Sequence, residues 1–143
     1  MNSSVVIGAL NRLLAVHCQS VAMYLINTNP WTPRGEHQAQ AVFGDLVADR
    51  SELIERLARY VDRLGGMPNC GQRHDYTVLN DLSLDFLLGR VISDQKETIH
   101  MIEQSLTDFD SDVEAKALAQ EALGMAKGHL ESLEELAQNS MRS

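Results

Sequence analysis

Four long segments of this 143-residue chain each repeat apolar residues every three or four positions, and this pattern limits the possible folds more than any other feature. Residues at that spacing share one face of an α-helix, so each segment predicts a helix with one apolar stripe. Clusters of Pro, Gly, Asn and Asp separate the segments, which we place at 3–28, 36–64, 77–107 and 112–139. Aromatic residues make up only 5% of the chain, and no alternating apolar run predicts a strand. The chain is therefore predicted to be all-α.

The lengths of the connections predict how the four helices are arranged. About eleven residues follow Gly65 before the third helix, and an extended chain of that length spans roughly 33 Å, enough to cross a bundle from end to end. The other two connections are shorter. A four-helix bundle with a long second crossover has helices that run up, down, down and up. We predict a single domain over 1–143, because a chain of this size can bury a core of its own.

Each predicted helix carries one polar side chain at the centre of its apolar stripe, near the helix midpoint. These four residues are His17, Arg50, Gln95 and His129. Their positions predict a polar layer in the core, where four-helix bundles commonly hold a metal or a cofactor. The two histidines and Asp49 would suit a mononuclear site for iron, or for zinc or manganese, because two imidazoles and a carboxylate leave open positions. Alternatively, the four side chains form a hydrogen-bonded layer that fixes the register of the helices.

Arg50 bears on the choice between these two alternatives. A buried guanidinium keeps its positive charge and disfavours a metal cation nearby. It also needs a carboxylate partner, and Asp49 and Asp85 are the nearest candidates by helix face. A third alternative is that Arg50 binds a small anion.

Composition argues against several classes of function. The chain has 12 basic and 20 acidic residues, for a net charge of −8, which disfavours binding to nucleic acid or to anionic membranes. It has no apolar run of transmembrane length, no pattern of a signal peptide and no phosphate-binding or nucleophile motif. We expect a cytoplasmic protein with no nucleic-acid or membrane partner. Cys18 and Cys70 are too few for a disulfide framework, so we expect two reduced thiols.

Three short motifs resemble parts of the ferritin-like superfamily, of bacterioferritins and Dps proteins in particular. Residues 10–14 (LNRLL) resemble the start of a bacterioferritin first helix, and residues 64–69 (LGGMPN) resemble the end of the second helix in both groups. Residues 128–134 (GHLESLE) resemble the bacterioferritin fourth helix around its metal-binding histidine. The resemblance implies a ferritin-like four-helix bundle that forms a homo-oligomer and handles iron or protects against oxidative stress.

The dinuclear iron site of that family is not preserved here. His129 matches the fourth-helix histidine, but Ala126 stands where the family has a glutamate three residues earlier. His17 stands at the first-helix glutamate position, and Arg50 and Leu53 stand at the second-helix Glu-x-x-His. Bridging carboxylates neutralise and space the two irons of such a centre. A normal ferroxidase centre is therefore not expected.

Two function hypotheses follow from these matches and departures. The first is a divergent ferritin-like protein that handles iron at one metal held by His17, Asp49 and His129. The second is a structural or scaffolding bundle whose metal centre has been replaced by a polar network. Ser51 stands where bacterioferritins have the haem-ligating methionine, so no haem is expected. Whether the protein is an enzyme stays open at this point.

Two other signals are expected to be structural. Glu97 and His100 have a Glu-x-x-His spacing, but both point away from the apolar stripe of their helix and are expected to face solvent. The acidic run 108–112 is expected to cap the fourth helix, because carboxylates are favourable at helix N-termini.

Overall fold

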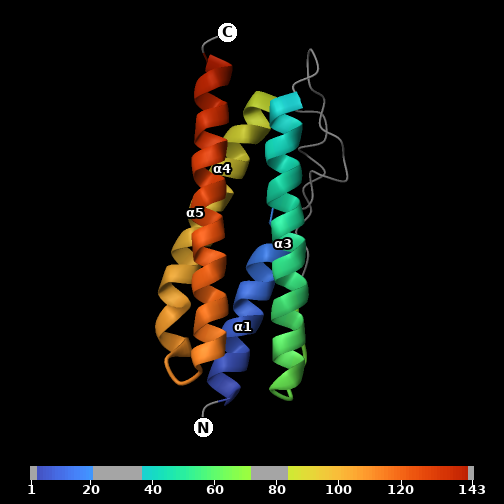
Figure 1. The fold of residues 1–143 in the computed structure, drawn as a ribbon, viewed down its shortest axis with the longest axis vertical. Coiled ribbons are helices and arrows are strands. Elements are labelled where there is room, and N and C mark those ends of the chain that lie inside the picture. Colours follow the sequence, from blue (N-terminus) through green and yellow to red (C-terminus); the bar gives the residue numbers. More distant parts are fainter. Residues whose placement is uncertain (1–2, 21–36, 72–83, 142–143) are drawn as a thin grey trace.

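The predicted helices form an antiparallel bundle in the computed structural model (Figure 1), which describes residues 3–20, 37–71 and 84–141. The elements are α1 (Ser3–Cys18), α3 (His37–Arg63), α4 (Leu84–Ser105), the short 3-10 helix η2 (Leu106–Phe109) and α5 (Val113–Met141). No strand occurs among the described residues. The all-α prediction is confirmed.

The helix directions match the predicted topology. α1 and α5 run in one direction and α3 and α4 in the other (Figure 1). α3 ends beside the start of α1, whereas α4 starts at the opposite end of the bundle. The connection from Arg63 to Leu84 therefore joins opposite ends of the bundle, which is the arrangement of ferritin-like folds.

The observed helix boundaries lie close to the predicted ones wherever the structure describes them. α3 and α5 begin and end within about two residues of the prediction, an error normal for helix ends. The predicted third helix ends with a 3-10 turn rather than as a regular α-helix. Residues 21–28 and 77–83 of the predicted helices lie outside the described residues. None of the described helices combines the length and the apolar character that a membrane span requires.

The core consists of two groups of buried apolar side chains. The larger group takes residues from α1, α3, α4, η2 and α5, whereas the smaller one takes residues from α3, α4 and α5 only. Their largest buried members are Leu10, Leu13, Leu14, Leu57, Ile102 and Phe109 in the first group, and Leu46, Leu87 and Leu133 in the second. Each such side chain contributes roughly 1.5–3 kcal/mol by leaving water. On α3 and α4 the two groups are separated in sequence by buried polar residues.

The start of α5 is fixed by an acidic cap, as predicted. The Asp112 Oδ1 accepts a hydrogen bond from the Ala115 backbone N–H at 3.0 Å. The Tyr60 hydroxyl donates to both carboxylate oxygens of Asp112, at 2.7 and 2.9 Å. Asp112 thus joins α3 to the first turn of α5.

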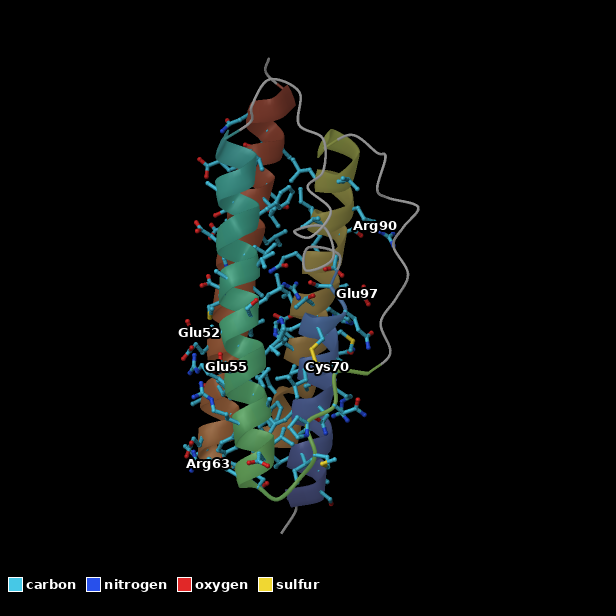
Figure 2. All side chains as sticks on the ribbon, turned by 90° about the vertical axis from the view of Figure 1, so that its right-hand side faces the viewer. Glu52, Glu55, Arg63, Cys70, Arg90 and Glu97 are labelled. Atoms are coloured by element: carbon cyan, nitrogen blue, oxygen red, sulfur yellow. A yellow bond between two sulfur atoms is a disulfide. The ribbon has the colours of Figure 1, made fainter. Side chains whose placement is uncertain are left out.

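The segment after α3 runs back along α1. Gly65, at φ 86°, ends α3 in the left-handed conformation that glycine adopts without strain. Cys70 then reaches the last residue of α1, and the structure has a disulfide between Cys18 and Cys70, with a Cα–Cα distance of 5.6 Å (Figure 2). The prediction of two reduced thiols is wrong, because the path of the crossover brings together cysteines 52 residues apart.

Candidate functional site at the centre of the bundle

The buried guanidinium of Arg50 organises the centre of the bundle. Its Nη1 donates to His17 Nδ1 on α1 at 3.3 Å. Its Nη2 donates to Gln95 Oε1 at 2.8 Å and to Thr98 Oγ1 at 3.2 Å, both on α4. The Gln95 amide then donates to the Ala126 carbonyl oxygen on α5 at 3.0 Å. One hydrogen-bonded network therefore joins α1, α3, α4 and α5.

Helical periodicity places these side chains at the centre. Arg50 replaces one apolar residue in the buried stripe of α3, between Leu46 and Leu53, and it is only 3% exposed. His17 and Gln95 are 2% and 1% exposed. The sequence-based prediction that these three polar residues lie in the core is confirmed.

His17 is a neutral imidazole in this network. Burial, helped by the positive charge of Arg50, lowers the pKa of His17 to about 3. Because Nδ1 accepts a hydrogen bond from Arg50, the ring proton belongs on Nε2. The His17 Nε2 and the Arg50 Nε are both buried and have no hydrogen-bond partner among the described residues. The network thus contains more hydrogen-bond donors than acceptors, and two of its N–H groups have no acceptor in the part of the chain that the structure describes.

Among the described residues, the carboxylate that forms an ion pair with Arg50 is that of Asp94, which was not a predicted partner. The Asp94 Oδ2 lies 3.8 Å from Arg50 Nη2, with the Asp94 side chain 23% exposed. Burial lowers the pKa of Arg50, and the Asp94 charge opposes that effect. A guanidinium nevertheless keeps its charge in proteins. The prediction of Asp49 as the partner is wrong, and the side chain of Asp85 lies outside the described residues.

His129 lies at the edge of the core. Its Nε2 is 2.8 Å from Asp49 Oδ2, and the two side chains are 14% and 44% exposed. The pair lines a groove between α3 and α5 together with Asp45 and Ser132. His129 therefore bonds outward to α3 rather than to the network around Arg50. The fourth member of the predicted polar layer is absent from that network.

The structure thus divides the three predicted metal ligands between two contacts. Asp49 and His129 contact each other, whereas His17 contacts Arg50. Among the described residues, no group of three or more His, Cys, Asp or Glu side chains is placed to hold a metal ion. A mononuclear site on all three residues stays a prediction without geometric support.

The core residues do not fit the dinuclear iron centre that the resemblance implies. Such a centre needs several anionic carboxylates, whereas this network consists of a neutral imidazole, an amide, a hydroxyl and a guanidinium. The described carboxylate nearest to it, that of Asp94, already lies beside the positive charge of Arg50. A buried guanidinium repels cations strongly in a low-dielectric interior.

Sequence reasoning missed two residues of the network, Thr98 and Asp94. Thr98 is 2% exposed, and its hydroxyl also donates to the Asp94 carbonyl oxygen at 3.0 Å. The sequence did contain a signal for the burial of Thr98, because it lies at the three-and-four spacing of the α4 stripe, between Gln95 and Ile102. The predicted solvent-facing pair is indeed exposed, both at Glu97, labelled in Figure 2, and at His100.

Solved structures with the same fold include diiron proteins. The chain is similar to a ferritin-like diiron-carboxylate protein from Bacillus anthracis, at 19% identity over 94% of this chain and 96% of that one, with a TM-score of 0.77. It is also similar to the bacterioferritin of Desulfovibrio desulfuricans, at 16% identity over 98% of this chain and 82% of that one, with a TM-score of 0.78. No protein-family model and no curated protein sequence matches it.

These likenesses define the class of the fold. The chain has the ferritin-like four-helix fold with the long second crossover. Sequence identities of this size establish the fold only, so the activity has to be inferred from the residues of the site.

Proposed function

We propose that this chain is a non-catalytic ferritin-like subunit with a structural or scaffolding role, in which an arginine-centred network has replaced the metal centre. One observation carries the proposal. The guanidinium of Arg50, 3% exposed, donates hydrogen bonds to side chains of α1 and α4. The resemblance puts Arg50 at the position of a metal-binding glutamate, so a cation stands where the family has an anion.

The magnitude of the repulsion supports this proposal. A divalent ion about 6 Å from the guanidinium would be repelled by roughly 5 kcal/mol at an effective dielectric constant of about 20. A repulsion of that size would weaken the affinity for the ion a thousandfold or more. The hydrogen bonds of Arg50, in contrast, join three helices without any ion.

We also propose that the subunit acts as a cytoplasmic homo-oligomer. The ferritin-like fold supports the oligomeric part of this proposal, since a bundle without chemistry of its own can act by building an assembly. Sedimentation-velocity analysis of the purified protein tests it. A monomer at micromolar concentration would contradict the scaffolding role.

A second candidate function is iron handling at the His129–Asp49 pair. An imidazole and a carboxylate in contact, partly exposed and with Asp45 along the same groove, are ligand types that Fe²⁺ accepts, as do Zn²⁺ and Mn²⁺. In this case the ion would take the place of the direct hydrogen bond and His17 would have no part in its binding. Protection against oxidative stress would follow from removal of free Fe²⁺.

Aerobic oxidation of Fe²⁺, followed by the absorbance of the ferric product, separates the two functions. Under the structural role, the wild-type protein oxidises Fe²⁺ no faster than buffer, and His129→Ala changes nothing. Under the second function, the protein accelerates oxidation and His129→Ala removes the acceleration. Arg50→Met serves as the matched control, because it alters the core and leaves the groove pair intact.

A further inference from the structure

The first half of the crossover is held on the outside of α1 by weak contacts and one covalent bond. The Asn11 amide donates to the Met67 carbonyl oxygen at 3.1 Å, and the Asn69 backbone N–H donates to Asn11 Oδ1 at 2.9 Å. The Gln19 amide donates to the Cys70 carbonyl oxygen at 2.9 Å. All three hydrogen bonds are exposed, so each contributes little on its own.

The backbone of this segment approaches α1 closely at two glycines. A Cβ atom on Gly66 would lie 2.8 Å from the Ile7 side chain, and one on Gly71 would overlap with the Gln19 amide. The segment therefore lies directly on the helix. The Cys18–Cys70 disulfide then closes this contact at its far end (Figure 2).

The disulfide is accessible, and it lies next to the central network. Cys70 is exposed and Cys18 is half-buried, and access to the bond is one of the requirements for thiol–disulfide exchange. Cys18 directly follows His17, which bonds to Arg50, and the Val16 carbonyl oxygen also accepts from Arg50 Nη1 at 3.5 Å. The last turn of α1 thus carries both the covalent bond and one end of the network.

The apolar packing of α1 does not depend on the disulfide. The buried apolar residues of α1 are Val6, Ala9, Leu10, Leu13 and Leu14, and all of them precede the cysteine by a turn or more. Opening the bond would leave this packing in place. The exposed hydrogen bonds alone would then hold the crossover.

We propose that Cys18–Cys70 is a redox-operated clamp, which a dithiol reductant opens to release residues 66–71 from α1 while the bundle stays folded. In the exchange, the Cys18–Cys70 bond breaks, each sulfur takes up one proton, and the reductant gives up two electrons and becomes a disulfide. A disulfide oxidant reverses the step. The proposal relies on the proposed cytoplasmic location for one point only, namely that disulfides there are mostly reversible rather than permanent.

Hydrogen exchange of the purified protein, oxidised in air and then treated with dithiothreitol or with a Cys-x-x-Cys protein dithiol, tests the clamp. The probe is the backbone amide of Asn69, which donates to Asn11 Oδ1 on α1. On reduction, this amide should exchange at least about tenfold faster, near the rate of an unstructured peptide. The amides of Leu57 and Leu133 should stay protected by a factor of about 10³ or more. Reoxidation should restore the first state.

The Cys18→Ser, Cys70→Ser double variant is the matched control. It should show the exchange pattern of the reduced protein without any reductant and should not respond to one. Two free thiols in the air-oxidised protein would overturn the proposal, as would a bond that a dithiol cannot open under native conditions. Loss of protection at Leu57 and Leu133 together with the crossover would make the disulfide a staple of the whole fold instead. None of these outcomes depends on metal binding or oligomeric state, so the clamp and the proposed function can fail separately.

Discussion

Replacing Arg50 by Met tests the energetic role of the central network. Methionine keeps the length of the side chain and removes the donors. It leaves two buried acceptors without their partner, His17 Nδ1 and Gln95 Oε1, whereas the Thr98 hydroxyl keeps its bond to the Asp94 carbonyl oxygen. Each buried acceptor left unsatisfied costs about 1–3 kcal/mol.

Removing the charge also relieves a cost. Burying a guanidinium is expensive, and Asp94 at 3.8 Å offsets only part of that cost. We expect the sum to remain unfavourable, with Arg50→Met lowering the free energy of unfolding by about 2–4 kcal/mol. The measurement is urea unfolding followed by circular dichroism, with an unchanged m value as the sign that the unfolded state is the same.

A double-mutant cycle with Gln95→Met isolates one bond of the network. The hydrogen bond from Arg50 Nη2 to Gln95 Oε1 is charge-assisted, buried and 2.8 Å long, so we expect a coupling free energy of about 1.5–3 kcal/mol. If Arg50→Met were as stable as the wild type or more stable, and the coupling were close to zero, the network would be no more than a tolerated remnant. An arginine-organised core would then be refuted.

Three further predictions concern pH, the α5 cap and the disulfide. Because the folded pKa of His17 is about 3 and the unfolded value is about 6.5, the unfolded chain binds the extra proton between these values. The free energy of unfolding should therefore fall as the pH drops from about 6.5 towards 3, by up to about 1.4 kcal/mol per pH unit from this site. Urea unfolding at several pH values measures this dependence. The free energy of unfolding should depend less steeply on pH in His17→Asn, because asparagine keeps a hydrogen-bond acceptor and does not titrate. Tyr60→Phe should lower the free energy of unfolding by about 1–2 kcal/mol, and Asp112→Ala should lower it by more, since the aspartate also caps α5. Equal losses of stability in thermal unfolding would argue against a role of Asp112 in both contacts. Cys18→Ser should lower the free energy of unfolding by about 2–4 kcal/mol relative to the oxidised protein, because the Cys18–Cys70 bond closes a loop of 52 residues, and reductant should bring the wild type to the same value.

The fold could be predicted from the sequence because its main signal is local. The spacing of Leu53, Leu57 and Val61 on one helix, and of Val91, Gln95 and Ile102 on another, identifies the buried face without knowledge of the partner helix. The long connection after Gly65 then determined the helix order. The burial of Arg50 and Gln95 could be predicted for the same reason, because each occupies a position of its own helix's apolar stripe.

The partners of the buried groups could not be predicted in the same way. Periodicity assigns a residue to a face, but it does not give the axial offset between two helices. Helix face gave Asp49 and Asp85 as the candidate partners of the buried arginine, whereas the packing of α3 against α4 places Asp94 3.8 Å from Arg50 Nη2. His129 occupies a core position by spacing, yet its side chain turns to the edge and contacts Asp49.

The Cys18–Cys70 bond was beyond sequence reasoning for a related reason. Two cysteines 52 residues apart give no pattern that marks a pair. Their contact depends on the path of the crossover over α1, which Gly66 and Gly71 permit by lying against Ile7 and Gln19. That path is a property of tertiary structure.

The metal content of the purified protein after anaerobic loading with iron, zinc or manganese, followed by dialysis, tests the central claim most directly. An arginine-organised core predicts that elemental analysis finds no tightly held ion that depends on His17, so the wild type and His17→Ala give the same content. About one ion per chain that is lost in His17→Ala would contradict the claim and restore a metal centre in the core. An ion lost only in His129→Ala would place iron handling in the groove between α3 and α5.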